Sequence, residues 1–547
     1  MTKHSKPWPG FFKAGTAEIF SAIGTREPQC GYNILLNRQI LLIREAHTVT
    51  LFRPFVIVAL LAGAAPSFAA GLTLTLDDAV RGAIGNNLSL KAEAFNPAIS
   101  GTDVRRARAI YNPRFSVLLD HRGANSPASQ TFPVFSISAT RVRFFDANVS
   151  TDVLLPTGAT ASASFTNLWR QDNLETFLSR FAQPNLTLSL SQPLLQKLGR
   201  EITEREIAVA TFATESALVR WRAQALSVSG NTRDQYFALI KARQNLQTRK
   251  ASLALAREIH ASNEARVRAG VLAAIELLDS RLGVAQREKD LLEAEKNALD
   301  EADKLRVLLH LPFQTDFIVP EAFPEAAIDR SEENALRKAL AMRPDLLQAR
   351  TNLKSQEFSE KVGRNLLLPS LSLKGSAGLT ALAPDYATGI DDLRTGKFPL
   401  WSVGIELAYP LGNDAAEADL AKNRLQAGQS RVQIQSLEES AGLEVRQAIR
   451  NLETREKQIA VANRGVELAE ARFDSYVKRG KVGLSTTRDI LQVESDLTVA
   501  LEGLAGARSD YQVAVTQLWK STGELLERHG IRIEEKDIEY SAWKEIR

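Results

Sequence analysis

The sequence predicts an internally duplicated α+β membrane protein with four β-strands in each chain and long coiled-coil helices. Three observations predict this fold. A segment typical of an export signal lies near the start, the same order of predicted elements occurs twice, and short runs with strand periodicity alternate with long stretches that contain no proline. The length of 547 residues alone would also allow several ordinary domains.

The segment 53–69 is typical of a secretory signal peptide. Arg53 precedes an apolar run at about 55–65, and small residues follow up to Ala69, where a signal peptidase would cleave. The run is shorter than the roughly 20 apolar residues that a membrane-spanning helix needs. We therefore expect residues 1–69 to be a presequence that is removed on export.

Loss of the presequence changes the charge and the cysteine content of the chain. It removes seven of the 68 basic and three of the 64 acidic side chains, which leaves 61 of each. A net charge of zero gives no indication of a nucleic-acid partner. The only cysteine, Cys30, leaves with the presequence, so we expect neither a disulfide nor a cysteine-ligated metal in the mature chain.

The internal duplication is visible as two stretches that align without gaps. Residues 79–117 align on 335–373 at a spacing of 256 positions, with identities that include Ala79/Ala335 and Pro113/Pro369. We expect a first repeat at 72–309, a proline-containing connector at 310–329, a second repeat at 330–525 and a C-terminal tail at 526–547.

Alternating residues predict strands that suit a membrane barrel. Between Trp401 and Tyr409 apolar residues alternate with small or polar ones, and the two aromatic ends lie roughly 26 Å apart. This length is close to the ~25 Å apolar band, flanked by aromatic girdles, of a transmembrane barrel. Trp401 and Tyr409 are therefore candidate membrane-interface residues. The same alternation is found in the runs that begin at Phe115, Leu186 and Leu371.

Four strands cannot close a barrel, and lipid tolerates no open sheet edge. Several copies of the chain must therefore contribute strands, and three copies would supply twelve. A soluble sandwich would show the same alternation. Residues at about 144–169 form two further alternating runs around a Pro156-Thr157-Gly158 turn, without counterpart in the second half. They predict an extra hairpin or an enlarged external loop.

Two long stretches predict a helical tunnel. From about Glu201 to Ala269 there is no proline and one glycine, which allows a continuous helix of about 100 Å. Apolar residues from Val493 to Leu518 follow a heptad pattern, so this helix needs a close-packed partner. A solitary coiled coil would show the same pattern.

Matched turns end the long helices in both halves. Arg266, Gly270 and Glu276 have the same spacing as Arg479, Gly483 and Asp489, which lie 213 positions later. The glycines let the chain reverse, and the acidic residues lie where the helix dipole favours negative charge. Simple capping explains both acids. In a trimer, Asp489 could also contribute to a ring of three carboxylates that lines a pore.

Motifs for catalysis, metal binding or phosphate binding are absent from the sequence, so we expect no enzyme activity and no cofactor. The charged stretch 287–304 carries carboxylates interleaved with lysine and arginine, which is typical of a solvated helix face.

Three features resemble the TolC-type outer-membrane efflux proteins over nearly all of residues 72–525: the duplicated A-x-R-x-A helix that leads to P-x-x-S, the paired strand ends QPLL (192–195) and YPLG (409–412), and the two turns. The resemblance implies a homotrimer with a twelve-stranded β-barrel in outer-membrane lipid and an α-helical barrel in the periplasm. It also implies an exit duct for efflux or type I secretion. Its partners would be a periplasmic adaptor (membrane fusion protein) of the HlyD type and an inner-membrane pump of the RND, ABC or MFS type.

The same resemblance implies roles at the second turn. Better-known channels of this kind close their tips with acidic residues at the Asp489 position and three residues later, where this chain has Gln492. Their bracing tyrosine and arginine fall at Gly480 and Ser485, so we expect this chain to lack that bracing network. Arg479, Lys481 and Arg488 are candidates for a different one. An exported coiled-coil scaffold or adaptor without channel activity is the alternative function.

Overall fold

The computed structural model describes residues 72–531 except for 128, 133–134, 138–139, 174–178, 321 and 325–327. The chain divides into two compact units, Met1–Ala69 and Ala70–Arg547, and every element named below lies in the second. The predicted signal peptide and the last part of the predicted tail, 532–547, lie outside the described residues.

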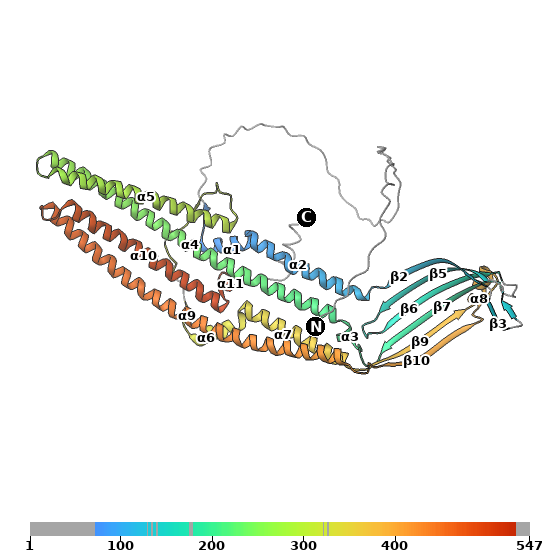
Figure 1. The fold of residues 1–547 in the computed structure, drawn as a ribbon. Helices are drawn as coiled ribbons and strands as arrows, with labels where there is room; N and C mark the ends of the chain where they lie inside the picture. The colour runs from blue at the N-terminus through green and yellow to red at the C-terminus, as the bar shows by residue number, and fades with distance from the viewer. Residues whose placement is uncertain are drawn as a thin grey trace, which may run out of the picture. The chain divides into compact units, whose positions relative to one another are not determined.

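The first repeat runs from helices into a sheet and back into helices (Figure 1). Its elements are, in order, α1 (Leu76–Asn86), α2 (Leu88–Arg108), the 3-10 helix η1 (Ala109–Tyr111), β2 (Arg114–Ser126), β3 (Ser129–Phe132), β4 (Phe135–Ile137), β5 (Thr140–Leu154), β6 (Thr160–Asp172), β7 (Arg180–Pro193), α3 (Arg200–Thr203), α4 (Arg205–Arg268) and α5 (Ala274–Leu309).

The second repeat has the same order with fewer strands. Its elements are α6 (Glu332–Met342), α7 (Pro344–Leu366), β9 (Ser370–Thr380), α8 (Tyr386–Thr395), β10 (Pro399–Ala408), α9 (Asp414–Lys481), α10 (Thr487–Thr522) and α11 (Leu525–Arg528). A short parallel pair joins the start of the first repeat, β1 (Leu72–Thr73), to the segment between the repeats, β8 (Phe317–Ile318).

Equal helix lengths confirm the internal duplication. Helices α1 and α6 have 11 residues each and begin 256 positions apart, while α5 and α10 have 36 residues each and begin 213 positions apart. The helix starts are encoded in the same way, because Thr75 and Ser331 cap α1 and α6 by accepting a backbone N–H three residues later.

Helices α4 and α9 have 64 and 68 residues, so each is about 100 Å long at 1.5 Å per residue. Each turns back tightly into a 36-residue helix, which gives the antiparallel hairpins α4–α5 and α9–α10 (Figure 1). The predicted heptad seam of α10 is buried or half-buried throughout, with Val493 and Leu518 each 2% exposed. None of the described helices is both long and apolar enough to span a bilayer.

The sheet has six antiparallel strands in the order β10-β9-β7-β6-β5-β2. The predicted count of four strands per chain is corrected to six, because β5 and β6 are inserted between β2 and β7. The alignment of the two halves does not indicate these strands, because the second repeat contributes only β9 and β10. Of the two interpretations of residues 144–169, the structure shows the extra hairpin and not an external loop.

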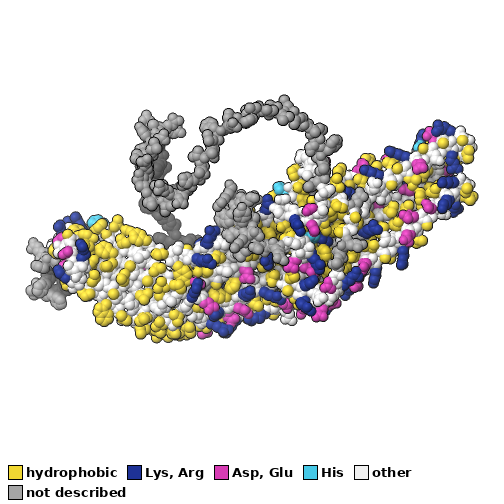
Figure 2. Space-filling view, turned by 180° about the vertical axis from the view of Figure 1, so that it is seen from behind, with side chains coloured by type: hydrophobic (Ala, Val, Ile, Leu, Met, Phe, Trp, Pro, Cys, Tyr) yellow, Lys and Arg dark blue, Asp and Glu magenta, His cyan; other side chains and the backbone are white. Residues whose placement is uncertain are grey.

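The sheet separates an apolar face from a polar face, as the alternation predicts. On β10 the side chains of Trp401, Val403, Ile405 and Leu407 are exposed on one face. On the other face Ser402 is hydrogen-bonded to Ser376 (2.8 Å), and Glu406 is paired with Lys374. Figure 2 shows the sheet end of the unit as largely hydrophobic, whereas the helices carry many charged side chains among hydrophobic ones.

Candidate functional site

The two hairpin turns have the same backbone geometry. Gly270 and Gly483 have φ angles of +75° and +77°, a left-handed conformation that glycine adopts without strain. In both turns the N–H of the next residue donates to the carbonyl of the arginine five residues earlier: Val271 to Arg266, and Leu484 to Arg479, each at 2.9 Å. This is the glycine-dependent end of a helix that lets the chain reverse at once.

The two acidic residues at matched positions act differently. Asp489 forms a capping box at the start of α10, where its carboxylate accepts the Thr486 N–H (3.0 Å) and the Thr486 hydroxyl accepts the Asp489 N–H (3.1 Å). Helix α5 has no side-chain cap of its own. Glu276 instead reaches the other hairpin and accepts the N–H of Thr487 (2.9 Å).

Further contacts bind the second turn to the first hairpin. The buried Asn263 of α4 donates to the Thr487 hydroxyl (2.8 Å). Arg488 forms a weaker pair with Asp279 of α5 (3.4 Å). Glu276, Asn263 and Asp279 therefore hold the start of α10 against the α4–α5 hairpin, so the two turns of one chain form a single tip.

Gly480 and Ser485 occupy the positions at which related channels carry their bracing tyrosine and arginine, and neither links the turn to another hairpin. A side chain at Gly480 would collide with Ile490, since a Cβ there would lie 2.5 Å from its terminal carbon. Ser485 donates to the Tyr476 carbonyl (2.9 Å). Arg479 stays within its own turn, where its guanidinium lies over the Tyr476 ring (5.2 Å) and donates to the Leu484 carbonyl (3.4 Å).

Gln492 lies on the exposed side of α10, one turn beyond Asp489, and donates to Asp496 (3.0 Å). Asp496 is also paired with Arg472 of α9 (2.8 Å), so it links the two helices of the second hairpin. Hydrogen bonds from Thr486, assisted by the nearby Arg479 and Arg488, lower the pKa of Asp489 below its ordinary value. Asp489 therefore presents an exposed negative charge at neutral pH.

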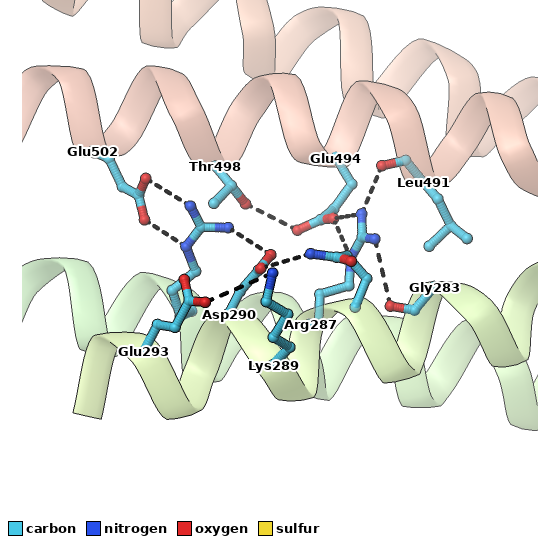
Figure 3. Close-up of polar contacts among 11 residues, drawn as sticks. Gly283, Arg287, Lys289, Asp290, Glu293, Leu491, Glu494, Thr498 and Glu502 are labelled. Carbon is cyan, nitrogen blue, oxygen red and sulfur yellow. Dashed lines mark hydrogen bonds and ion pairs between the residues drawn. The ribbon is translucent and has the colours of Figure 1, made fainter. Parts of the chain in front are cut away.

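A polar network that sequence reasoning missed lies behind the tip, between α5 and α10 (Figure 3). Arg287 and Glu494 are 9% and 3% exposed, and their closest nitrogen and oxygen atoms are 2.6 Å apart. Arg287 also donates to the Leu491 carbonyl (2.8 Å), and Thr498 donates to Glu494 (3.0 Å). The expectation that 287–304 is a solvated face is therefore wrong for Arg287.

A second ion-pair cluster adjoins this network. Arg249 of α4 makes two hydrogen bonds to Glu502 of α10 (2.6 and 2.8 Å) and one to Asp290 of α5 (3.2 Å). This two-pronged geometry is the one in which arginine binds a carboxylate most strongly. Together the two clusters fasten α10 to both helices of the first hairpin.

Of the predicted membrane-interface residues, Trp401 lies on the apolar face of β10 and Tyr409 follows the end of this strand. Trp401 is 78% exposed and Tyr409, one residue beyond the end of the strand, is 51% exposed. They lie at opposite ends of the strand, so the exposed aliphatic residues between them form a band bounded by aromatic rings.

Comparisons with known proteins agree with this architecture. A family model described as outer membrane efflux protein matches residues 79–309 and 335–524. The outer membrane efflux protein BepC of Brucella suis biovar 1 is 26% identical over 225 residues, which are 41% of this chain and 47% of BepC. The chain thus aligns with about half the length of that relative.

Two further proteins extend the comparison. The probable efflux pump outer membrane protein TtgC of Pseudomonas putida is 23% identical over 354 residues, 62% of this chain and 69% of TtgC. The CmeC outer membrane channel of Campylobacter jejuni has a similar fold, with a TM-score of 0.58 over 85% of this chain and 89% of CmeC, at 18% identity.

Proposed function

Because the chain belongs to the outer membrane efflux protein family, we propose that it forms the outer-membrane exit duct of a tripartite efflux system or a type I secretion system. An inner-membrane pump loads the substrate, and the duct conducts it passively. The family model matches both repeats, so the resemblance inferred from the duplicated motifs is confirmed, and the protein is located in the outer membrane.

The observation that carries this proposal is the open, two-faced sheet at one end of long helical hairpins. Strands β2 and β10 each pair with one neighbour only among the described residues, so both edges carry unpaired backbone groups. Such edges cannot face lipid, where no water is present to bind them. Further copies of the chain must cover them, which supports a closed homotrimer.

The helical part also leaves apolar surface uncovered. On α5 the side chains of Leu282 and Leu292 are 70% and 66% exposed, and on α9 those of Val461 and Leu468 are 67% and 73% exposed. Uncovered apolar stripes on long helices are typical of a coiled-coil contact that is still to be made. A ring of three copies would bury the α5 stripe of one copy against the α9 stripe of the next.

The tip supplies a surface for a periplasmic adaptor. Val271, Val482 and Leu484 surround the two turn glycines and are each about 70% exposed. A small apolar patch at the end of a rigid hairpin suits docking to the helices of an adaptor of the HlyD type. TtgC is described as an efflux pump protein; by analogy, the pump behind this duct would be of the RND, ABC or MFS type.

The aperture hypothesis is that Asp489 lines the narrow end of the duct. Its carboxylate is exposed and ionised, and in a trimer it would recur three times around the axis. This arrangement would give the closed tip a weak affinity for divalent cations, with Gln492 in place of a second acidic ring.

Fractionation of expressing cells tests the proposal against the alternative of an exported scaffold. We expect the protein in detergent extracts of the outer membrane, as a trimer that resists heating in mild detergent. Recovery of all the protein in the soluble periplasmic fraction, as a monomer or dimer, would favour the scaffold.

A further inference from the structure

The inserted hairpin β5–β6 lies inside the sheet and not beside it. Strand β5 pairs with β2 along 13 residues, and β6 pairs with β7 along 12. The second repeat has only β9 and β10 at the corresponding places. The insertion therefore widens the wall by two strands in each chain.

Both faces of the sheet continue across the insertion without a break. Cross-strand neighbours on the apolar face include Val117 opposite Val149, Val149 opposite Phe165, and Phe165 opposite Leu186. Because side chains alternate with a period of two, this register keeps all four residues on the side that also carries Val403 and Ile405. A hairpin that lay outside the barrel sheet would not need to place its apolar and polar residues on the same faces as the other strands.

The polar face continues in the same way. Ser116 of β2 is hydrogen-bonded to Ser150 of β5 (2.7 Å), and Arg122 of β2 is paired with Asp146 of β5 (2.9 Å). The Arg122 and Arg170 guanidinium groups lie over the ring of Phe144 (5.0 and 5.8 Å). Ion pairs of this kind suit a water-filled interior and not a lipid-facing surface.

The turn of the inserted hairpin is fixed at the base of the sheet, where the helices begin. The Gly199 N–H, next to α3, donates to the Thr157 carbonyl (3.0 Å), and the Thr157 hydroxyl donates to Gln192 of β7 (2.9 Å). Gly158 has a φ of +89°, and a Cβ there would lie 2.5 Å from the Lys197 carbonyl. These contacts place β5 and β6 alongside the other strands over their full length.

We propose that three copies of this chain close a barrel of eighteen strands, six from each copy, in place of the twelve that the resemblance implies. This inference rests on the proposed function as a trimeric duct. Strands alternate in direction across the six-stranded sheet, so β2 and β10 run in opposite directions. The β10 edge of one copy can therefore pair antiparallel with the β2 edge of the next, three times in succession, which leaves no open edge.

The consequence is a wider outer-membrane opening. Barrel diameter grows roughly linearly with strand number, so eighteen strands give an opening about 1.5 times as wide as twelve do. On the lumen-facing side the insertion adds short polar residues at Asn148, Ser150, Ser162, Ser164 and Thr166, and larger side chains at Phe144, Leu168 and Arg170. The outer end of this duct would thus admit bulkier solutes than a twelve-stranded barrel does.

Cysteine substitutions test the wall position of the hairpin, since Cys30 is the only native cysteine. Trimers that carry Val149→Cys, Phe165→Cys, Ser150→Cys or Ser164→Cys are labelled with bimane and reconstituted into phosphatidylcholine vesicles. Nitroxide-bearing lipid and aqueous iodide serve as quenchers. Val403→Cys and Ser402→Cys on β10 are the matched controls for a lipid-facing and a lumen-facing position.

We expect lipid quenching at 149 and 165, as at 403, and iodide quenching at 150 and 164, as at 402. Suppose that iodide quenches all four hairpin positions, while 403 is still quenched by lipid and 402 by iodide. This result would overturn the eighteen-stranded barrel but not the proposed duct. Loss of contrast at 402 and 403 as well would overturn both. A strand count from electron microscopy of the trimer gives an independent answer: eighteen supports the inference, and twelve contradicts it.

Discussion

Glu276 accepts the backbone N–H of Thr487 at 2.9 Å, so an acidic residue at the start of one returning helix caps the start of the other. The two hairpins of the chain are thereby joined at their tips. We expect Glu276→Ala to cost about 1 kcal/mol, the usual value of a helix cap, and to speed amide hydrogen exchange around Thr487. Glu264→Ala, an exposed position on α4, is the control and should leave this exchange unchanged.

The buried pair of Arg287 and Glu494 gives the largest expected effect on stability. Glu494→Ala leaves the Arg287 charge buried without its partner, which costs about 3–5 kcal/mol. The free energy of unfolding, measured by chemical denaturation in detergent, checks this value. Glu288→Ala removes the exposed pair with Arg257 (2.7 Å) and should cost less than about 1 kcal/mol. Equal losses for the two substitutions would contradict the buried position of Glu494.

Two glycines of the second hairpin should respond to alanine with opposite signs. Gly483→Ala places a side chain at a φ of +77° and should destabilise the tip by about 1 kcal/mol. Gly503→Ala lies within α10 with open space around it, so it should stabilise the helix by up to about 1 kcal/mol. Thermal unfolding of the two variants in parallel measures both shifts in melting temperature. Shifts of the same sign would contradict the left-handed backbone at Gly483.

Asp489→Asn tests the aperture hypothesis. The substitution removes three exposed charges from a trimer, so we expect severalfold weaker block of single-channel current by divalent cations. Because hydrogen bonds hold the pKa of Asp489 below its usual value, block of the unmodified channel should stay constant between pH 5 and 8. Unchanged conductance and unchanged divalent block in Asp489→Asn would remove the hypothesis.

His529 is expected to make stability depend on pH. Arg233 can only donate, so it donates to Nε2 (3.0 Å), and Nδ1 carries the proton that bonds Asp77 (2.6 Å). Burial, with the Arg233 charge nearby, lowers the pKa of His529 below 6.5. The unfolded chain then binds the proton more readily, so this contribution is complete above pH 6.5 and is lost as pH falls toward the folded pKa. The loss is at most about 1.4 kcal/mol per pH unit.

Denaturation at pH 7 and pH 5 checks this dependence. His529→Gln should be less stable than the unmodified protein at pH 7 and should show a smaller loss between the two pH values. The same slope in both proteins would assign the pH dependence to other groups.

Much of the tip was predictable from the sequence because the duplication marks it twice. Gly270 and Gly483 are matched by spacing, and both have the left-handed backbone that the turn requires. The sequence also placed Asp489 at the start of its helix as a capping residue, and the structure adds Thr486 as its partner in a capping box. The hydrogen bond between Glu276 and Thr487 could not be predicted, because the sequence pattern of one hairpin does not indicate how the second hairpin packs against it.

The same limit applies to the network behind the tip and to the sheet. Arg287 lies in a charged stretch, and only the close approach of α10 at Gly283 and Leu491 buries it. Strands β5 and β6 have the same alternation of apolar and polar residues as the other strands of the sheet. The second repeat, however, has no strands that correspond to them. An insertion into one repeat carries no symmetry signal, so its pairing had to come from the structure.

Single-channel recording of the purified, unmodified trimer in planar bilayers tests the exit duct most directly. For a duct we expect stepwise, long-lived increases in current whose frequency scales with the amount of trimer added. A confirmed trimer that inserts into the bilayer and conducts no current under any applied voltage would contradict it.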